Sequence, residues 1–258
     1  MIIVVTGASS GIGLEVARLF AKDSNNFIYA LNRSEVKENN INWIKCDVSD
    51  IFSTSNAIKQ VVSKHSNMDL LINNAGMGIS GAVEYHTEDE IRKIIDVNLV
   101  GLINVTRLSL PYMKKGSKII NVSSVAGPIS IPYQTLYSVS KSGVLAFSNG
   151  LRNEVRPLGI KVTSILPGDT KTNFTQNREK SIDNGRYGKR IENSVRKMER
   201  DETTGVSAFK VAKKVYKVSK KKNPNTYYVV GFSYAFLVFL SRILPKRFVN
   251  WIIFKIYG

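Results

Sequence analysis

The N-terminus of the chain joins an apolar segment to a glycine-rich turn and an amphipathic segment. Residues 1–5, Met-Ile-Ile-Val-Val, form a continuous apolar run that is typical of a strand buried on both faces. Residues 6–13 read Thr-Gly-Ala-Ser-Ser-Gly-Ile-Gly, and residues 14–21 have the apolar spacing of a helix. A strand, a glycine turn and a helix in this order are the context in which backbone N–H groups bind the pyrophosphate of a dinucleotide.

The glycines of this turn have separate expected roles. Gly7 permits a tight turn, whereas Gly11 and Gly13 let the backbone approach a pyrophosphate and let the helix pack on the strand. The positive dipole end of the helix adds to the attraction for phosphate. The alternative is an ordinary glycine-rich turn of an α/β protein. If the turn binds a dinucleotide, its contact residues are Gly7, Ser9, Ser10, Gly11, Ile12 and Gly13.

Strand patterns and helix patterns alternate along the rest of the chain. Such alternation predicts an α/β fold with a doubly wound parallel sheet covered by helices on both faces. We expect strands near residues 2–6, 27–31, 42–45, 69–73, 117–122, 160–166 and 226–231. We expect helices near residues 11–23, 54–65, 88–113, 134–156 and 205–221. The 258 residues suffice for a single large domain with a full core.

Tyr137 and Lys141 are the residues that most strongly indicate chemistry. In a helix over 134–156 their four-residue spacing places them on one face, with Ser124 thirteen residues upstream of Tyr137. A free tyrosine has a pKa of about 10, and a neighbouring cation lowers it toward the working range. That arrangement suits proton exchange with an alcohol or a carbonyl oxygen. A solvated helix face that carries the two residues by chance is the alternative.

Further motifs accompany the glycine spacing T-G-x-x-x-G-x-G, all in one order. They are Asn73-Asn74-Ala75-Gly76, Asp96-Val97-Asn98, Ile119-Ile120-Asn121-Val122-Ser123-Ser124, Tyr137-Ser138-Val139-Ser140-Lys141 and Pro167-Gly168. Over roughly residues 2–231 the chain therefore resembles the short-chain dehydrogenase/reductase family. The resemblance implies a Rossmann-like sheet of about seven strands and a nicotinamide cofactor.

The resemblance also implies a role for each polar residue of these motifs. Tyr137 corresponds to the general acid in carbonyl reduction and to the base in alcohol oxidation. Lys141 corresponds to the residue that lowers the tyrosine pKa and holds the nicotinamide ribose, and Ser124 to the one that binds the substrate oxygen. Asn98 corresponds to a residue that completes a proton relay through water to Lys141; a polar residue that kinks or caps its helix is the alternative. No metal site is expected.

The end of the second predicted strand bears on the type of cofactor. An Asp or Glu usually binds the free ribose hydroxyls of NAD(H) there, whereas a 2′-phosphate requires a cation. This chain has Asn32 at the expected acidic position and Arg33 next to it. Because Arg binds phosphate bidentately, we predict NADP(H). A solvated loop charge is the alternative interpretation of Arg33.

The resemblance implies further cofactor contacts along the chain. Asp47 and Val48 correspond to contacts with the adenine, and Asn74, Ala75 and Gly76 to the segment behind the adenosine ribose. The remaining contacts are Pro167, Gly168, Thr170 and Thr172. Thr172 corresponds to a threonine that meets the nicotinamide carboxamide, whereas Thr170 stands where a Val or Ile is more usual.

Residues 173–204 are polar and rich in arginine and lysine. In the family the corresponding stretch is a mobile lid over the substrate. Its cations favour an anionic substrate, such as a phosphate ester or a carrier-bound acyl group. A solvated surface helix is the alternative.

Much of the net charge of +17 comes from residues 210–222, which are rich in lysine and contain no Asp or Glu. On a helix, Lys210, Lys213, Lys214 and Lys217 form a one-sided basic face. Such a face attracts nucleic acid, anionic lipid or an acidic protein. We expect no nucleic acid, because no aromatic-interleaved platform or known motif accompanies the cations.

The C-terminal residues are apolar. Residues 227–240 carry no charge, and their first part, to Gly231, is the predicted seventh strand. The remainder is shorter than the roughly 20 apolar residues that span a bilayer. Residues 248–257 are aromatic and broken by cations, as in a helix that lies in a membrane interface. We therefore expect a Rossmann-type domain over 1–231 and an apolar extension over 232–258.

We hypothesise that this extension attaches the protein peripherally to an anionic membrane surface. A wall of the substrate pocket and an oligomer contact are the alternatives. Since the chain begins directly with its first strand, we expect no targeting peptide and a cytoplasmic location. The single cysteine, Cys46, is expected to be a small core residue. The family commonly pairs its long helices, so a homo-oligomer, dimer or tetramer, is also expected.

Together these features predict an NADPH-dependent oxidoreductase that reduces a ketone or aldehyde, or oxidises the alcohol, with a hydrophobic or lipid-like substrate. Residues 243–245, Ile-Leu-Pro, and the apolar segment after them resemble the branch of hydroxysteroid, retinol and acyl-dihydroxyacetone-phosphate reductase-like enzymes. The alternative function is an NADP(H)-binding regulatory or scaffold protein at the membrane surface. Such a protein has no need of Ser124, Tyr137 and Lys141 together.

Overall fold

Seven parallel strands form one central sheet in this computed structural model, which describes residues 1–181 and 185–258. Their order across the sheet is β11-β7-β6-β4-β1-β2-β3. The strands are β1 (Ile2–Thr6), β2 (Phe27–Asn32), β3 (Ile41–Lys45), β4 (Met68–Asn73), β6 (Met113–Val122), β7 (Lys161–Pro167) and β11 (Tyr227–Val230). The predicted α/β class and doubly wound parallel sheet are confirmed.

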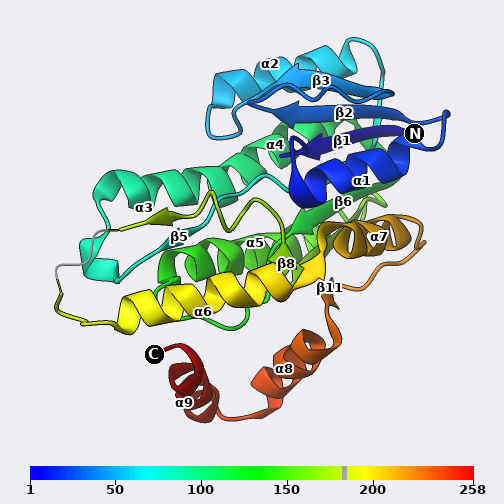
Figure 1. Cartoon of the computed structure of the whole chain (residues 1–258). Helices are drawn as coiled ribbons and strands as arrows, with labels where there is room; N and C mark the ends of the chain where they lie inside the picture. Colours follow the sequence, from blue (N-terminus) through cyan, green and yellow to red (C-terminus); the bar gives the residue numbers. More distant parts are fainter. Residues whose placement is uncertain (182–184) are drawn as a thin grey trace.

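Helices cover both faces of the sheet (Figure 1). They are α1 (Gly11–Ala21), α2 (Ile51–Val62), α3 (Glu88–Ile95), α4 (Gly101–Ser109), α5 (Thr135–Glu154), α6 (Arg190–Thr204), α7 (Ala208–Ser219), α8 (Phe232–Ile243) and α9 (Lys246–Tyr257). Helices α1 and α7 pack together on one face, and α2, α4 and α5 lie on the other. Two-residue strands outside the main sheet are β5 (Ile79–Ser80), β8 (Thr170–Lys171), β9 (Glu179–Lys180) and β10 (Val206–Ser207).

The apolar N-terminal run is explained by the position of β1 within the sheet. Ile2 and Val4 belong to the core on one face, whereas Ile3 and Val5 belong to the core on the other. Both faces are buried, so neither set of alternate side chains reaches solvent.

The helix expected over residues 88–113 is interrupted. Between α3 and α4 the backbone forms a π-helical segment, Asp96–Val100, and a 3-10 turn, Leu110–Tyr112, follows α4. Strand β6 then begins at Met113, earlier than the predicted 117–122. The π-helical segment matters for the site because it contains the fully buried Asn98.

This interrupted helix is also the stretch that membrane criteria single out. Among the described residues, Glu88–Tyr112 is long and apolar enough to cross a membrane by length and composition. Here it lies within the fold, where its parts pack against α2, α5 and β4. Its apolar side chains therefore serve the core of the domain.

Two helix starts differ from expectation because of capping residues. The Asp50 side chain accepts the backbone N–H groups of Phe52 and Ser53, so α2 begins at Ile51 rather than near 54. The Ser207 side chain accepts the N–H of Lys210 and starts α7 at Ala208.

Helices α8 and α9 form a hairpin that extends from the end of β11 (Figure 1, orange and red). Its inner residues Val238, Val249 and Ile253 pack with Ile129, in the segment that follows β6. The hairpin therefore contacts the same part of the fold that carries Ser124.

Candidate active site

A cavity of about 610 Å³ opens at the carboxyl ends of the central strands. Strands β1 and β4 are neighbours there although β2 and β3 separate them in the chain, which makes this the switch point of the doubly wound sheet. Every residue predicted to act in catalysis or to bind the cofactor lines this cavity, with the exception of Gly13 and Asn98. Residues from Gly7 to Glu202, far apart in the sequence, thus converge on one site at the edge where such folds bind ligands.

The glycine turn between β1 and α1 has the geometry that its sequence predicts. Gly7 has a φ of +65°, in the left-handed region that glycine tolerates best. A β-carbon at Gly13 would lie 2.3 Å from the Gly7 carbonyl oxygen and 2.5 Å from the side chain of Asn74. Gly13 is therefore required for close packing of the turn rather than for direct contact with a ligand, which explains why it does not line the cavity.

The start of the segment after β4 holds the turn in place. Asn74 donates through Nδ2 to the carbonyl oxygen of Gly7 at 2.9 Å, and the Thr6 hydroxyl accepts the N–H groups of Asn74 and Ala75. Asn74, Ala75 and Gly76 therefore form one wall of the cavity next to the glycine turn.

The C-terminal end of β2 carries no Asp or Glu side chain. Asn32 is buried, and its Oδ1 accepts the Ala8 N–H at 3.2 Å. Arg33 is exposed and lines the cavity, as does Asp47, whose carboxylate accepts the hydroxyl of Ser49. Lys45 was not anticipated here: it pairs in register with Asn32 and shares a second, smaller hollow with Arg33. Parallel pairing of β2 and β3 was the signal in the sequence that leads to it.

Ser124, Tyr137 and Lys141 meet at the opposite end of the cavity. Tyr137 and Lys141 lie one turn apart on α5, and the Lys141 Nζ is 5.7 Å from the centre of the Tyr137 ring. Lys141 is 4% exposed and donates to the Val122 carbonyl oxygen at 3.1 Å. Ser123 faces away from this group and donates to the backbone carbonyl of Lys141 at 2.8 Å.

The pKa values of this group correct one expectation. Burial raises the pKa of Tyr137 to about 12, while a hydrogen bond with the Ser124 side chain opposes that rise. Burial also lowers the pKa of Lys141 to about 8. The lowered tyrosine pKa that was expected from Lys141 is not found in the protein alone, because the loss of hydration dominates the shift and the charges that act on the phenol are those of Glu202, Arg178 and Asp169.

Asn98 is placed by the π-helical segment at the back of the same site. Its side chain accepts the Met77 N–H at 2.7 Å and donates to the Met77 carbonyl and to the Ser140 hydroxyl. A β-carbon at Gly76 would meet both the Asn98 Oδ1, at 3.2 Å, and the Lys141 Nζ, at 3.3 Å. Asn98 therefore borders the lysine, but its hydrogen bonds hold backbone and a neighbouring helix.

The segment after β7 closes the side of the cavity. Thr170 donates its hydroxyl to the Gly168 carbonyl at 2.8 Å, and the Thr172 hydroxyl accepts the Phe174 N–H. Gly168 packs against the ring of Tyr234 from α8, since a β-carbon there would lie 2.1 Å from that ring. The C-terminal hairpin thus supports the wall that Pro167 and Gly168 form.

A buried ion pair that no sequence motif indicates lies near Tyr137. Arg178 donates to the carboxylate of Glu202 on α6, and its side chain is 1% exposed. Its guanidinium lies over the Phe174 ring, which is itself 5.7 Å from the ring of Tyr137. Among the described residues, the Arg178 Nε and Nη1 have no hydrogen-bond partner.

Most lysine and arginine side chains of residues 173–204 form ion pairs with carboxylates. The pairs, all within the described residues, are Lys180–Glu199, Arg186–Glu84, Arg196–Glu192, Lys197–Asp201 and Arg178–Glu202. At the Tyr137 end of the cavity the wall carries the carboxylates of Asp169, Glu179 and Glu202. The basic composition of this stretch therefore does not make the cavity wall basic.

Comparison with known proteins agrees with the fold and identifies the family. The family model described as short chain dehydrogenase matches residues 1–183. The 3-ketodihydrosphingosine reductase of Bacteroides thetaiotaomicron is 38% identical over 229 residues, which cover 86% of this chain and 85% of that protein. The probable short-chain type dehydrogenase/reductase VdlC of Helicobacter pylori is 34% identical, with 96% of this chain and 94% of that protein covered.

Solved structures show the same architecture. A short-chain dehydrogenase from Streptomyces avermitilis superimposes with a TM-score of 0.83 at 25% identity, covering 98% of this chain and 95% of that chain. A Burkholderia phymatum member in complex with NAD gives 0.82 at 20% identity, with 93% and 92% covered. A Burkholderia cenocepacia member in complex with NADP gives 0.73 at 22% identity, with 88% and 95% covered.

The chain belongs to the short-chain dehydrogenase/reductase family and is an oxidoreductase of the kind that uses a nicotinamide cofactor. The residues present fit such a cofactor, because the glycine turn and the Asn74 segment border one cavity whose lining includes both Arg33 and Tyr137. Among the described residues no group of three His, Cys, Asp or Glu side chains is placed to hold a metal ion.

We expect burial of Lys141 to lower the free energy of unfolding. The pKa of Lys141, about 8 in the folded protein, lies below its ordinary value of 10.5, so the unfolded chain binds more protons between these pH values. The contribution of Lys141 to the free energy of unfolding therefore rises as the pH rises from about 8 to 10.5. We expect Lys141→Met to stabilise the protein at pH 7 by about 1–3 kcal/mol and to stabilise it less at pH 9.5. Urea unfolding at both pH values measures this; an equal gain at the two would contradict it.

Proposed function

We propose that the protein is an NADPH-dependent reductase that converts a hydrophobic ketone or aldehyde to the alcohol, or catalyses the reverse oxidation. The observation that carries this proposal is the meeting of Ser124, Tyr137 and Lys141 at one end of a cavity that begins at the glycine turn. A protein that only bound the cofactor would not need a proton donor there.

The three side chains have complementary tasks in this proposal. Tyr137 gives its proton to the carbonyl oxygen as the alcohol forms, and Ser124 donates a hydrogen bond to the same oxygen. Lys141 is mainly protonated at neutral pH, because its pKa of about 8 lies above it, and its charge stabilises the phenolate that remains. Asn98 positions the Met77 backbone and α5 beside the lysine. The nicotinamide, when bound, supplies the hydride.

A lipid-like ketone is the substrate that we favour, on two grounds. The relative from Bacteroides thetaiotaomicron is named for a long-chain keto lipid, 3-ketodihydrosphingosine. In the present cavity, apolar side chains of Met77, Val125, Ile131 and Phe174 lie around the Tyr137 end. Apolar walls of this kind exclude water and bind hydrocarbon.

The test of this function is NADPH oxidation with 3-ketodihydrosphingosine as the probe, together with other hydrophobic ketones and aldehydes. We expect turnover by the wild type and a loss of about 1,000-fold in kcat for Tyr137→Phe, since proton transfer is removed. Tyr133→Phe is the matched control, because Tyr133 packs with Tyr187 outside the cavity. Tight NADPH binding without turnover of any carbonyl compound would instead favour the regulatory or scaffold function.

We further propose NADP(H) rather than NAD(H). Support comes from the absence of a carboxylate at the end of β2, where Asn32 is engaged with the backbone, and from the exposed Arg33 and the neighbouring Lys45. A 2′-phosphate at this position would gain charge-assisted hydrogen bonds.

Arg33→Ala should weaken NADPH binding by about 10- to 100-fold and leave NADH binding nearly unchanged, because only NADPH carries the phosphate. Fluorescence titration with each cofactor measures the two dissociation constants. Lys37→Ala, an exposed charge outside the cavity in the same segment, is the control. An unaltered NADPH affinity in Arg33→Ala would rule out this assignment.

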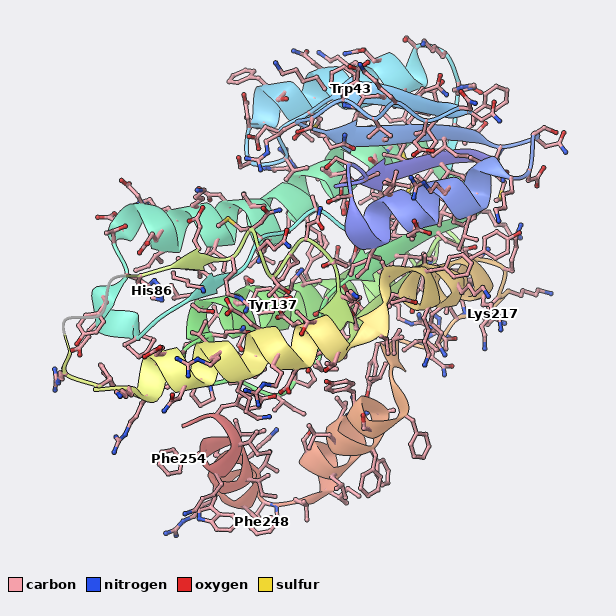
Figure 2. All side chains as sticks on the ribbon, viewed as in Figure 1. Trp43, His86, Tyr137, Lys217, Phe248 and Phe254 are labelled. Carbon is pink, nitrogen blue, oxygen red and sulfur yellow. The ribbon has the colours of Figure 1, made fainter. Side chains whose placement is uncertain are left out.

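We propose that the α8–α9 hairpin attaches the protein to an anionic membrane surface, as an extension of the catalytic domain over residues 1–231. The hairpin exposes large apolar side chains together with its own cations, as an interfacial helix does. The exposed apolar residues are Phe232 (92%), Phe236 (57%), Phe239 (59%), Ile243 (62%), Phe248 (47%), Trp251 (55%), Phe254 (55%) and Ile256 (42%). Figure 2 shows Phe248 and Phe254 on the hairpin, at a distance from Lys217 of α7. The basic residues relevant to lipid are therefore those of the hairpin itself, Arg242, Lys246, Arg247 and Lys255. A homo-oligomer remains a prediction from the family.

Replacing Trp251 and Phe254 by Glu should reduce binding to vesicles of mixed neutral and anionic phospholipid by about 100-fold or more, because two aromatic side chains no longer enter the interface. Co-sedimentation measures this binding. Phe52→Glu is a matched control, since Phe52 is 79% exposed on α2, away from the hairpin. Equal binding of the double variant and the control, or no binding by the wild type, would contradict the proposal.

A further inference from the structure

The carboxylates of Asp169, Glu179 and Glu202 line the same cavity as Tyr137, and among the described residues only Asp169 of these three forms no ion pair. Glu179 pairs with Lys93, and Glu202 pairs with Arg178. Asp169 lines the same cavity but forms no ion pair with any residue that the structure describes. Its side chain accepts a hydrogen bond from the hydroxyl of Tyr234, which is a neutral donor.

The position of Asp169 is fixed by its backbone. The Asp169 carbonyl accepts the Val206 N–H at 2.9 Å, beside the pairing of β8 with β10. A β-carbon at Gly205 would lie 2.2 Å from that carbonyl oxygen, so only glycine permits this approach. The Tyr234 ring packs on Gly168 from the other side. Asp169 is therefore held at a constant place in the cavity wall and does not sit on a mobile loop.

Asp169 is also close enough to the reacting groups to act on them. The charges of Glu202, Arg178 and Asp169 all influence the Tyr137 phenol. Arg178 and Glu202 compensate one another, which leaves the single negative charge of Asp169 near the carbonyl that Tyr137 would protonate. A half-buried carboxylate without a counter-charge is costly unless a ligand supplies one. Burial accordingly raises the pKa of Asp169, and the nearby Glu202 charge adds to that rise.

We propose that Asp169 binds a positively charged amino group adjacent to the reactive carbonyl, so that the substrate is a long-chain amino ketone. This inference rests on the proposed reductase function and narrows its substrate class. An ammonium at Asp169 neutralises the carboxylate, while the hydrocarbon chain occupies the apolar part of the cavity near Val125 and Ile131. 3-Ketodihydrosphingosine has this chemistry, with a protonated amine on the carbon next to its ketone. The same carboxylate repels a substrate that carries phosphate near its carbonyl, contrary to what the basic composition of residues 173–204 suggests.

The experiment compares two ketones that differ at one position. The probes are 3-ketodihydrosphingosine and its analogue in which a hydroxyl replaces the amino group, both assayed with NADPH at a pH at which the amine is charged. The wild type should prefer the amino ketone by about 30-fold in kcat/KM, the ratio expected for one partly buried charge pair. Asp169→Asn keeps the shape and the acceptor for Tyr234, and should bring this ratio close to one. Because the readout is a ratio, a general loss of activity in the variant does not affect it.

The matched control for Asp169→Asn changes a carboxylate outside the cavity. Asp201→Asn removes a neighbouring carboxylate that pairs with Lys197 and does not line the cavity, so this variant should retain the preference. A wild-type ratio near one, or an unchanged ratio in Asp169→Asn, would overturn the role of Asp169 while leaving the reductase intact. Better turnover of an acyl-dihydroxyacetone phosphate than of the amino ketone would also overturn it. Failure of the wild type to reduce any of these ketones would instead refute the proposed function.

Discussion

The hydrogen bonds between Asn74 and the glycine turn join the two strands between which the site is built. Asn74 follows β4, yet its side chain donates to the Gly7 carbonyl and its backbone N–H donates to the Thr6 hydroxyl oxygen. These bonds fix the ends of β1 and β4 relative to each other at the switch point of the sheet. The packing of Gly13 under the same carbonyl then fixes the start of α1. Without this arrangement neither the phosphate end nor the Tyr137 end of the cavity has a defined position.

The catalytic end is built at a cost in stability. Lys141 is nearly inaccessible and has one hydrogen bond, to the Val122 carbonyl, which does not replace full hydration of an ammonium. Burial acts on Tyr137 in the opposite sense, because it favours the neutral phenol. The protein alone therefore holds a neutral tyrosine, which has a proton to donate, beside a lysine whose positive charge would stabilise the phenolate left behind.

Local sequence was sufficient to predict the residues whose roles depend on local structure. Tyr137 and Lys141 share a helix, and the glycine turn lies between consecutive elements, so helical and strand periodicity located them. Lys45, Asp169 and Glu202 were missed because their positions depend on pairing between distant segments: Asp169 meets Tyr234 across 65 residues, and Arg178 meets Glu202 across 24. The pKa of Tyr137 was mispredicted for a related reason, since spacing reveals a neighbouring charge but does not reveal the depth of burial.

The C-terminal hairpin bears on both the proposed membrane attachment and the proposed binding of a lipid ketone. Its outer side exposes aromatic residues, whereas its inner side packs on Ile129 and places Tyr234 against Gly168 and Asp169. A keto lipid that leaves a membrane must transfer its chain into an apolar wall and its polar end to a polar partner. On the proposed function, the hairpin would link the lipid surface to the carboxylate beside the reacting carbonyl. None of its residues, all of which the structure describes, lines the cavity, but Tyr234 supports the cavity wall at Gly168 and Asp169. Support of the pocket and contact with lipid, two alternatives that the sequence left open, therefore do not exclude one another.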